Sequence, residues 1–211
     1  MKLYEFGPTR ALRVRWTLQE LGVDFDAVKV DLKAGDHLQP QFLKLNPAAK
    51  LPVLVDDGKV LTESVAIVMY LAEKYPEAGL LPRDPADRAQ AYRWLLFTAT
   101  ELEQPLWRIA RHGFLYPEEK RSPADVQLAR EDFKPMAEVM ERHMRGRSFV
   151  VGDAATVADF VLAYTLDWAD IEDLLQDFPV LKAYMEKMYR RPKATQRIAA
   201  ASAAAGTDKA N

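Results

Sequence analysis

Two short stretches in the first third of the chain decide its fold: NPAAKLPVL at residues 46–54 and LTESVAI at residues 61–67. Between them, an Asp-Gly pair at 57–58 separates two apolar runs, which is typical of a β-hairpin. Proline cannot donate to a strand ladder, so Pro52 must lie at the start or the edge of a strand, and a cis peptide bond is one way to make that turn. Backbone groups of Leu51 or its neighbours are then available to another partner.

The residues around these stretches alternate between strand and helix periodicity. Strands are expected at residues 2–6 and 25–30, with a helix between them that ends at Gly22. Such a strand-helix-strand unit implies a parallel pair with a right-handed crossover. Further helices are expected at 38–45 and 63–75. The first part of the chain is therefore predicted to be an α/β module.

After the proline-rich link at 81–85, only helical periodicity remains. The predicted fold class is accordingly α/β plus all-α. The long helices are expected at about 86–111, 123–144, 156–170 and 179–189.

The same patterns predict the domain boundaries. An α/β domain at 1–77 is followed by a linker at 78–85 and an all-helical domain at 86–198. Residues 199–211 are rich in alanine and contain no large apolar side chain, so a disordered tail is expected there.

Composition excludes several classes of protein. The 211 residues include 29 Lys and Arg against 31 Asp and Glu, a net charge of −2 that argues against a nucleic-acid binder relying on bulk charge. The absence of cysteine excludes a disulfide scaffold, a thiolate zinc site and a protein thiol nucleophile, and three scattered histidines make a metal site a poor hypothesis. No secretory apolar region or membrane-length apolar run is present, so a cytoplasmic protein is expected.

Two helix starts carry polar motifs. At Thr62-Glu63-Ser64, unpaired helix amides and the Ser64 hydroxyl could together hold a carboxylate, although ordinary helix capping is the alternative. The Thr156-x-x-Asp159 motif is an N-terminal capping box, to which we assign a role in folding.

Four motifs, in this order and spacing, resemble the cytosolic glutathione S-transferases of bacterial type, with theta-, zeta- and delta-like features. They are KLPV at 50–53, TESVAI at 62–67, YLAEKYP at 70–76 and TVADF at 156–160. The resemblance covers nearly the whole chain. It implies an N-terminal thioredoxin-like domain, βαβ-α-ββα, followed by an all-helical C-terminal bundle that contains the pocket for the acceptor substrate.

The resemblance also implies a site for glutathione as co-substrate, with no metal. His37 and Lys50 would hold the glycyl carboxylate, the Leu51 backbone would pair with the cysteinyl unit, and Glu63 and Ser64 would hold the γ-glutamyl end. The charges suit this peptide, because cations are needed at one end and an anion with helix amides at the other. A solvated loop histidine and a surface lysine are the alternatives for His37 and Lys50.

Catalysis in this family requires the thiolate of bound glutathione. The residues around the sulfur would be those at 7–11, but the serine position of theta-like and zeta-like members is taken by Pro8 and the cysteine position of beta-like members by Arg10. Thr9 is therefore predicted to donate to the thiolate, with Arg10 as the runner-up. Tyr4 lies within the first strand and is expected to pack or point away.

The acceptor pocket is expected between the domains, where the long helix from residue 86 meets the loops of the first domain. Ordinary packing at a helix end is the alternative for its candidate residues, and their arginines hint at an anionic or polar acceptor. The candidates are Trp107, Arg108, Arg111, His112 and Tyr116.

The leading hypothesis is a glutathione transferase that conjugates glutathione to an electrophilic small molecule, with a role in detoxification. A glutathione-binding regulatory or carrier protein with little turnover is one alternative. A glutathione-dependent peroxidase, reductase or isomerase is another, in which two glutathione molecules would carry the redox step. By resemblance a homodimer is expected, with neither nucleic acid nor membrane as a partner.

Overall fold

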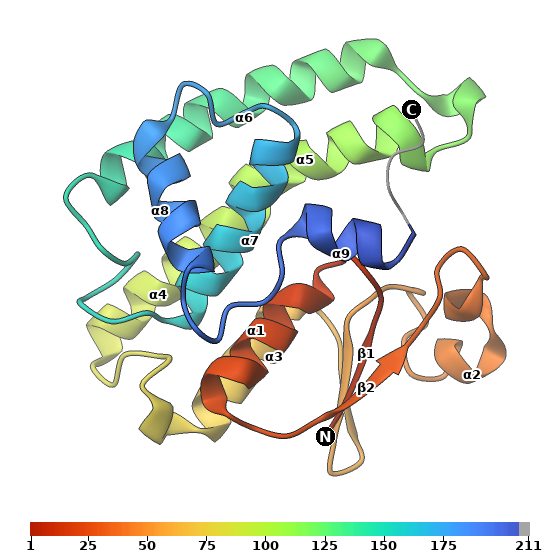
Figure 1. Cartoon of the computed structure of the whole chain (residues 1–211), viewed down its shortest axis with the longest axis horizontal. Helices are drawn as coiled ribbons and strands as arrows, with labels where there is room; N and C mark the ends of the chain where they lie inside the picture. Colours follow the sequence, from red (N-terminus) through yellow and green to blue (C-terminus); the bar gives the residue numbers. More distant parts are fainter. Residues whose placement is uncertain (207–211) are drawn as a thin grey trace. The chain divides into compact units, whose positions relative to one another are not determined.

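In the computed structural model, which describes residues 1–206, one mixed sheet forms with the strand order β2-β1-β3-β4 (Figure 1). β1 and β2 run parallel, whereas β3 is antiparallel to both β1 and β4. This arrangement confirms the crossover unit and the hairpin that the sequence predicts. The strands are β1 (Lys2–Glu5), β2 (Asp26–Lys29), β3 (Val53–Asp56) and β4 (Lys59–Leu61).

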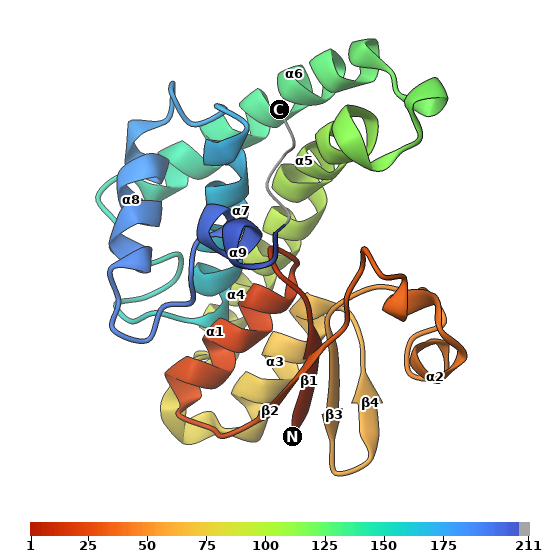
Figure 2. The same ribbon diagram turned by 45° about the vertical axis from the view of Figure 1, so that its right-hand side comes forward.

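Two helices, α1 (Ala11–Leu21) and α3 (Ser64–Lys74), cover one face of the sheet (Figure 2). Leu3 and its cross-strand partner Leu54 are completely buried. Gly22 ends α1 in the left-handed conformation, with a φ of 68°, which glycine adopts without steric cost.

The opposite face of the sheet carries the short helix α2 (Pro40–Leu43). Strand residues alternate between the two faces, so Tyr4 points away from Leu3 and its ring meets that of Phe42 edge-on, with 6.3 Å between the centroids. Tyr4 therefore packs in this second cluster, as expected. Its buried members are Phe6, Val30, Phe42, Leu51 and Val53.

The second compact unit extends from Pro82 to Met188 and is helical. α7 is buried over nearly its whole circumference, which is typical of a central helix. The α-helices of this second unit are α4 (Pro85–Phe97), α5 (Glu103–Ala110), α6 (Pro123–Met144), α7 (Val157–Ile171) and α8 (Pro179–Tyr189).

The predicted capping box begins α7. The Asp159 carboxylate accepts hydrogen bonds from the Thr156 amide at 2.8 Å, the Val150 amide at 2.8 Å and the Tyr184 hydroxyl at 2.7 Å. Burial raises the pKa of Asp159, while these hydrogen bonds oppose that rise. The motif joins the start of α7 to the preceding loop and to α8, which supports its assignment to folding.

The long helix expected at 86–111 forms as one continuous helical run from Pro85 to Leu115, and its hydrogen-bond pattern changes twice. Wider π-helical turns at Thr98–Leu102 and Arg111–Leu115 separate α4 from α5 and end α5. Pro105, the third residue of α5, has no amide hydrogen, so one hydrogen bond of the regular ladder is missing beside the first of these turns. The hydroxyl of Thr98, which donates to the Trp94 carbonyl at 2.8 Å, competes with the ladder at the same place.

The prediction of a disordered tail from residue 199 is wrong for the residues that the structure describes. Helix α9 (Ile198–Ala204) forms there, with Ile198 and Ala201 buried. Alanine has the highest helix propensity, and one isoleucine anchors the helix. The predicted tail residues 207–211 lie outside the described part of the chain.

The segment at 189–206, which we call the C-terminal strap, belongs to the first compact unit together with Met1–Leu81. The helical unit therefore ends at Met188, ten residues before the predicted limit of 198. The Arg191 guanidinium donates to both carboxylate oxygens of Glu20, at 2.7 and 2.9 Å. The ring of Tyr189 packs on Trp16 with 4.9 Å between the centroids.

Within residues 1–206, none of the helices combines the length and the apolar composition needed to cross a membrane.

Candidate functional site

The predicted glutathione-site residues lie on loops that leave the sheet at one edge. Glu5, at the end of β1, lies opposite Lys29, at the end of the parallel β2. The antiparallel β3 begins at this edge, where Val53 lies opposite Tyr4, and β4 returns to it. The topology thus brings one set of loops together, and these loops carry Thr9, His37, Lys50, Leu51, Glu63 and Ser64.

Thr9 lies in the loop between β1 and α1 and is half-buried. Its amide donates to the Phe6 carbonyl at 3.2 Å, and its hydroxyl accepts from the Ala11 amide at 3.4 Å. Because the hydroxyl accepts in that contact, its hydrogen can be donated to an anion beside the start of α1. The half-buried Arg10 directly precedes the helix.

Lys50 and Leu51 lie at the turn into β3, where the Leu51–Pro52 peptide bond is cis. Asn46 holds this turn: its side-chain amide donates to the Lys50 carbonyl at 2.8 Å, and its oxygen accepts from the Ala48 amide at 3.0 Å. The Leu51 side chain is anchored in the buried cluster, whereas the Lys50 side chain is exposed. The turn therefore presents an ammonium group to solvent from a fixed backbone.

Glu63 and Ser64 lie at the start of α3. Glu63 is exposed and has a φ of 63°, while Ser64 is buried and accepts a hydrogen bond at 3.3 Å from the guanidinium of Arg13. Arg13 is only 1% exposed, so a buried cation stands beneath the serine hydroxyl. This arrangement places positive charge and an exposed carboxylate at the same helix start. Both are needed to bind the end of a ligand that carries an ammonium and a carboxylate.

Two residues that were not predicted, Arg13 and Asn46, also hold this candidate site. The sequence signal for Arg13 is its spacing, because it lies four residues before Thr17 and so shares a side of α1 with it. In the structure both residues are buried, and the Thr17 hydroxyl donates to the Arg13 carbonyl at 2.9 Å. Asn46 precedes the turn directly and is buried. Asparagine commonly accepts from a backbone amide two residues on, which was the available signal.

His37 lies in a short 3-10 helix, Asp36–Leu38, that follows β2. The Asp36 carboxylate accepts from the Asp31 amide at 2.9 Å and shapes the loop. The imidazole is half-buried, and its Nδ1 atom has no hydrogen-bond partner among the described residues. A ligand carboxylate could therefore supply the missing partner.

Two of the predicted acceptor residues are held inside the helical unit. The Trp107 ring meets that of Trp168 edge-on, with 6.5 Å between the centroids. Arg108 pairs with Asp132 and lies 3.9 Å from the Asp125 carboxylate, both on α6. Its guanidinium is therefore already neutralised.

The other predicted acceptor residues gather at the turn that ends α5. The Arg111 guanidinium lies 4.6 Å from the centre of the Tyr116 ring, and the His112 ring meets the same tyrosine edge-on at 5.1 Å. Arg121 donates to the Tyr116 carbonyl at 2.8 Å and fixes the turn. The structure thus brings Arg111, His112 and Tyr116 together, and Arg108 is directed towards α6.

Within the described part of the chain, no three histidine, aspartate or glutamate side chains come close enough together to hold a metal ion.

Comparison with known proteins identifies the family of the chain. Residues 1–73 match the family model for the N-terminal domain of glutathione S-transferase, and residues 110–187 match that for its C-terminal domain. Glutathione S-transferase 1 of Dianthus caryophyllus is 36% identical over 208 residues, which cover 94% of this chain and 92% of the relative. The chain therefore belongs to the glutathione S-transferase family.

Other relatives extend the match. Glutathione S-transferase F9 of Arabidopsis thaliana is 35% identical over 89% of this chain and 86% of its own length. A sphingomonad glutathione S-transferase solved in complex with glutathione superposes with a TM-score of 0.81 at 31% identity, covering 98% of this chain and 99% of the other. The bacterial transferase BphK, solved as a ternary complex, gives a TM-score of 0.82 at 28% identity, covering 98% and 100%.

Proposed function

We propose that this protein is a glutathione transferase that binds glutathione at the loop edge of its sheet and conjugates it to an electrophilic small molecule. The observation that carries this proposal is the convergence of Lys50 and His37 with Glu63 and Ser64 on loops of one edge, in a chain that belongs to the family. The Lys50 ammonium and the unpartnered ring nitrogen of His37 suit the glycyl carboxylate. Glu63, Ser64 and the helix start suit the γ-glutamyl end, and the Leu51 backbone suits the cysteinyl unit.

Thr9 would then stabilise the glutathione thiolate. An ordinary thiol has a pKa of about 8.5, and lowering it by about two units requires roughly 2.7 kcal/mol of preferential stabilisation of the thiolate. A hydrogen bond to a charged group contributes roughly 1.5–3 kcal/mol, so one donated by the Thr9 hydroxyl would supply much of that amount. The start of α1 adds positive potential at the same place.

The first experiment is calorimetric titration with glutathione and with S-hexylglutathione, followed by the ultraviolet absorbance of the bound thiolate as a function of pH. Binding with thiolate present near neutral pH supports the transferase. Binding without an ionised thiol points to a carrier, and the absence of binding excludes both functions.

Replacing Thr9 by valine tests the donor. Thr9→Val should raise the pKa of the bound thiol by about one unit or more and lower kcat/KM about 10- to 100-fold, because one hydrogen bond to the anion is lost. Thr9→Ser retains the hydroxyl and should stay close to the wild type. If Arg10→Met raises the thiol pKa while Thr9→Val does not, the role belongs to Arg10.

For the acceptor, we propose an anionic or polar electrophile that contacts Arg111, His112 and Tyr116, with Trp107 as a further wall residue and Arg108 acting through its contact with α6. The support is the cluster around Tyr116, in which the guanidinium of Arg111 belongs to an exposed residue. Rates measured with matched electrophiles that carry or lack a carboxylate test this preference.

We also propose that the protein acts in detoxification in the cytoplasm and that it forms a homodimer. Conjugation removes reactive electrophiles, and the resemblance to the cytosolic branch of the family supports both the location and the twofold assembly. Light scattering coupled to size-exclusion chromatography should give twice the chain mass of 23.9 kDa. A mass of one chain at micromolar concentration would contradict the dimer.

A further inference from the structure

The loop that carries Thr9 connects the end of β1 to the start of α1. The Thr9 amide donates to the Phe6 carbonyl at 3.2 Å, and the Thr9 hydroxyl accepts from the Ala11 amide at 3.4 Å. These contacts all lie within residues 6–11, so they shape the loop but do not attach it to the rest of the fold. The position of Thr9 therefore depends on how β1 and α1 are held relative to each other.

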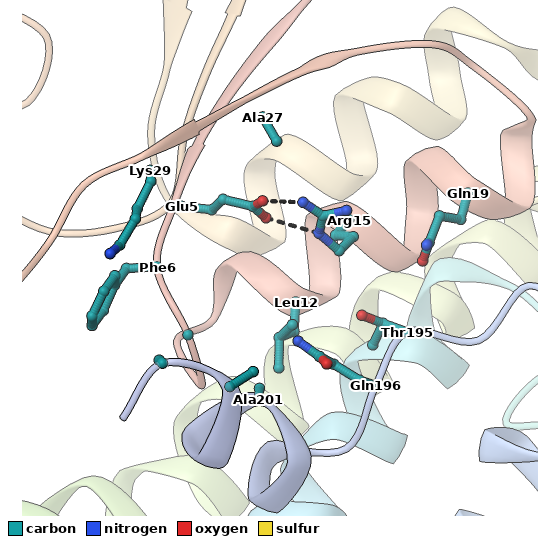
Figure 3. Close-up of a pocket in the computed structure, with 13 residues that line it drawn as sticks. Glu5, Phe6, Leu12, Arg15, Gln19, Ala27, Lys29, Thr195, Gln196 and Ala201 are labelled. Carbon is teal, nitrogen blue, oxygen red and sulfur yellow. Dashed lines mark hydrogen bonds and ion pairs between the residues drawn. The ribbon is translucent and has the colours of Figure 1, made fainter. Parts of the chain in front are cut away.

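An ion pair joins β1 and α1 across this loop. Glu5 is the last residue of β1, and Arg15 lies in the second turn of α1. The Arg15 guanidinium donates to both carboxylate oxygens of Glu5, from Nε at 3.0 Å and from Nη2 as well, and Figure 3 shows the two side chains facing each other. Two hydrogen bonds between planar groups fix the angle between the groups as well as their distance.

The surroundings of the Glu5–Arg15 pair restrict it further. The two side chains are only 15% and 29% exposed. The Arg15 guanidinium also lies 5.2 Å from the centre of the ring of Phe25, the residue directly before β2. Lys29, which lies beside Glu5 on the neighbouring strand, is paired with Asp31 at 3.1 Å. The Glu5 carboxylate is therefore held by Arg15, and Arg15 is held from two sides.

Stability alone does not account for a charged pair at this place. Glu5 lies on the same face of β1 as Leu3, which is completely buried, and taking charges out of water costs free energy. An apolar side chain would cover this face without that cost. The pair also borders a cavity of about 660 Å³, so packing does not enclose it on that side. What the pair adds is direction, because its two hydrogen bonds set the orientation of α1 relative to β1.

We propose that Glu5 and Arg15 are positioning residues for the transferase reaction. Their ion pair holds both ends of the loop, so that the donor in the loop lies within hydrogen-bond distance of the glutathione sulfur. A displacement of about 1 Å in such a group can lower a rate about 100-fold. This inference rests on the proposed function and applies to Thr9 and to Arg10 alike, because both lie in the loop.

The first test is the pKa of the glutathione thiol bound to the full chain, measured by ultraviolet absorbance. Arg15→Met should raise this pKa by about half a unit to one unit and lower kcat/KM about tenfold, because the donor is no longer held at the sulfur. The Kd for S-hexylglutathione, which has no free thiol, should stay within about twofold of the wild type.

The matched control is Arg191→Met, which removes the other bidentate pair of α1, that with Glu20, away from the loop. It should lower the stability and leave the thiol pKa unchanged. Equal thiol pKa values for Arg15→Met and the wild type would overturn the proposal, as would equal shifts in Arg15→Met and Arg191→Met.

A combined variant separates position from charge. Arg15→Met leaves the Glu5 carboxylate unpaired, and adding Glu5→Gln removes that negative charge. The thiol pKa should stay raised in the combined variant, because the link between β1 and α1 is still absent. A return to the wild-type pKa would show that the unpaired carboxylate repels the thiolate, and this result would contradict a positioning role.

Hydrogen exchange of the free protein tests the loop without glutathione. The amides of Thr9 and Ala11 should exchange at least about tenfold faster in the combined variant than in Arg191→Met, and equal rates would contradict the inference. A wild-type protein that ionises glutathione, with an unchanged thiol pKa in Arg15→Met, would overturn this inference alone. A wild-type protein that forms no thiolate near neutral pH would overturn the proposed function and the positioning role together.

Discussion

At the scale of single residues, the buried Arg13 guanidinium beneath the hydroxyl of Ser64 is an unusual feature of the predicted glutathione site. A cation held in a low-dielectric environment acts on nearby charges more strongly than one in water. Because the Ser64 hydroxyl accepts from Arg13, its hydrogen can be donated to the γ-glutamyl carboxylate that is expected at this helix start.

Ser64→Ala should raise the Kd for glutathione about tenfold, since a hydrogen bond to a charged ligand is lost. The matched control is Thr62→Val, which removes a hydroxyl two residues away that is not predicted to contact the ligand. Calorimetry on both variants measures the difference. An unchanged Kd for Ser64→Ala would assign this serine to helix capping alone.

Residues whose roles follow from local spacing could be located from the sequence, and residues whose roles depend on distant partners could not. The turn at Leu51 and the capping motif at Asp159 were recognisable because all the defining residues lie within a few positions. The partner of Arg108, Asp132, lies 24 residues away on another helix, and the sequence does not indicate this contact. Periodicity carries no information about which helix faces which.

At the scale of elements, the C-terminal strap is attached to α1 through the Glu20–Arg191 pair. Burial tends to raise the pKa of Glu20, but hydrogen bonds from Arg191 and Trp16 lower it below the ordinary value of 4.5. A carboxyl group with a lowered pKa stabilises the folded state above its unfolded pKa, and this contribution is lost as the pH falls through the folded value.

Arg191→Met should therefore destabilise the protein at pH 7 by about 2 kcal/mol, because two charge-assisted hydrogen bonds disappear. The difference in the free energy of unfolding between Arg191→Met and the wild type should narrow as the pH falls below about 4.5, the ordinary pKa of a glutamate. Urea unfolding at several pH values measures it. Arg190→Met makes the same charge change at an exposed neighbour, and a similar pH dependence there would show that the effect is only general charge.

Element types were predicted well where strong breakers bound a segment, as Gly22 does for α1. They were predicted poorly where a change in the hydrogen-bond ladder or a tertiary contact determines the element. The π-helical turn before Pro105 interrupts a pattern that remains helical in its apolar spacing. Helix α9 has no apolar stripe of its own and is ordered by docking Ile198 and Ala201.

At the scale of the whole molecule, the order of the elements predicted both the α/β module and the helical module. The chain's return to the first unit after Met188 was not predictable, because the contacts of Tyr189 and Arg191 join positions about 170 residues apart. Local pattern cannot specify contacts across such a separation.

A chain that ends after Met188 should lose roughly 3 kcal/mol of stability, since one face of the fully buried Trp16 is exposed when Tyr189 is removed. Urea unfolding should shift to a lower midpoint, and native tryptophan fluorescence should shift to longer wavelength. A chain that ends after Gly206 keeps the strap and serves as the control. Identical midpoints for the two truncations would show that the strap does not stabilise the first unit.

The discontinuous first unit also has a consequence for protein synthesis. Its sheet leaves the ribosome early, but the strap follows only after residues 82–188 have been translated. Domains generally fold in the order in which they are made, and this chain departs from that order. The surface around Trp16 stays uncovered during that interval, so the first unit to be translated is the last to be completed.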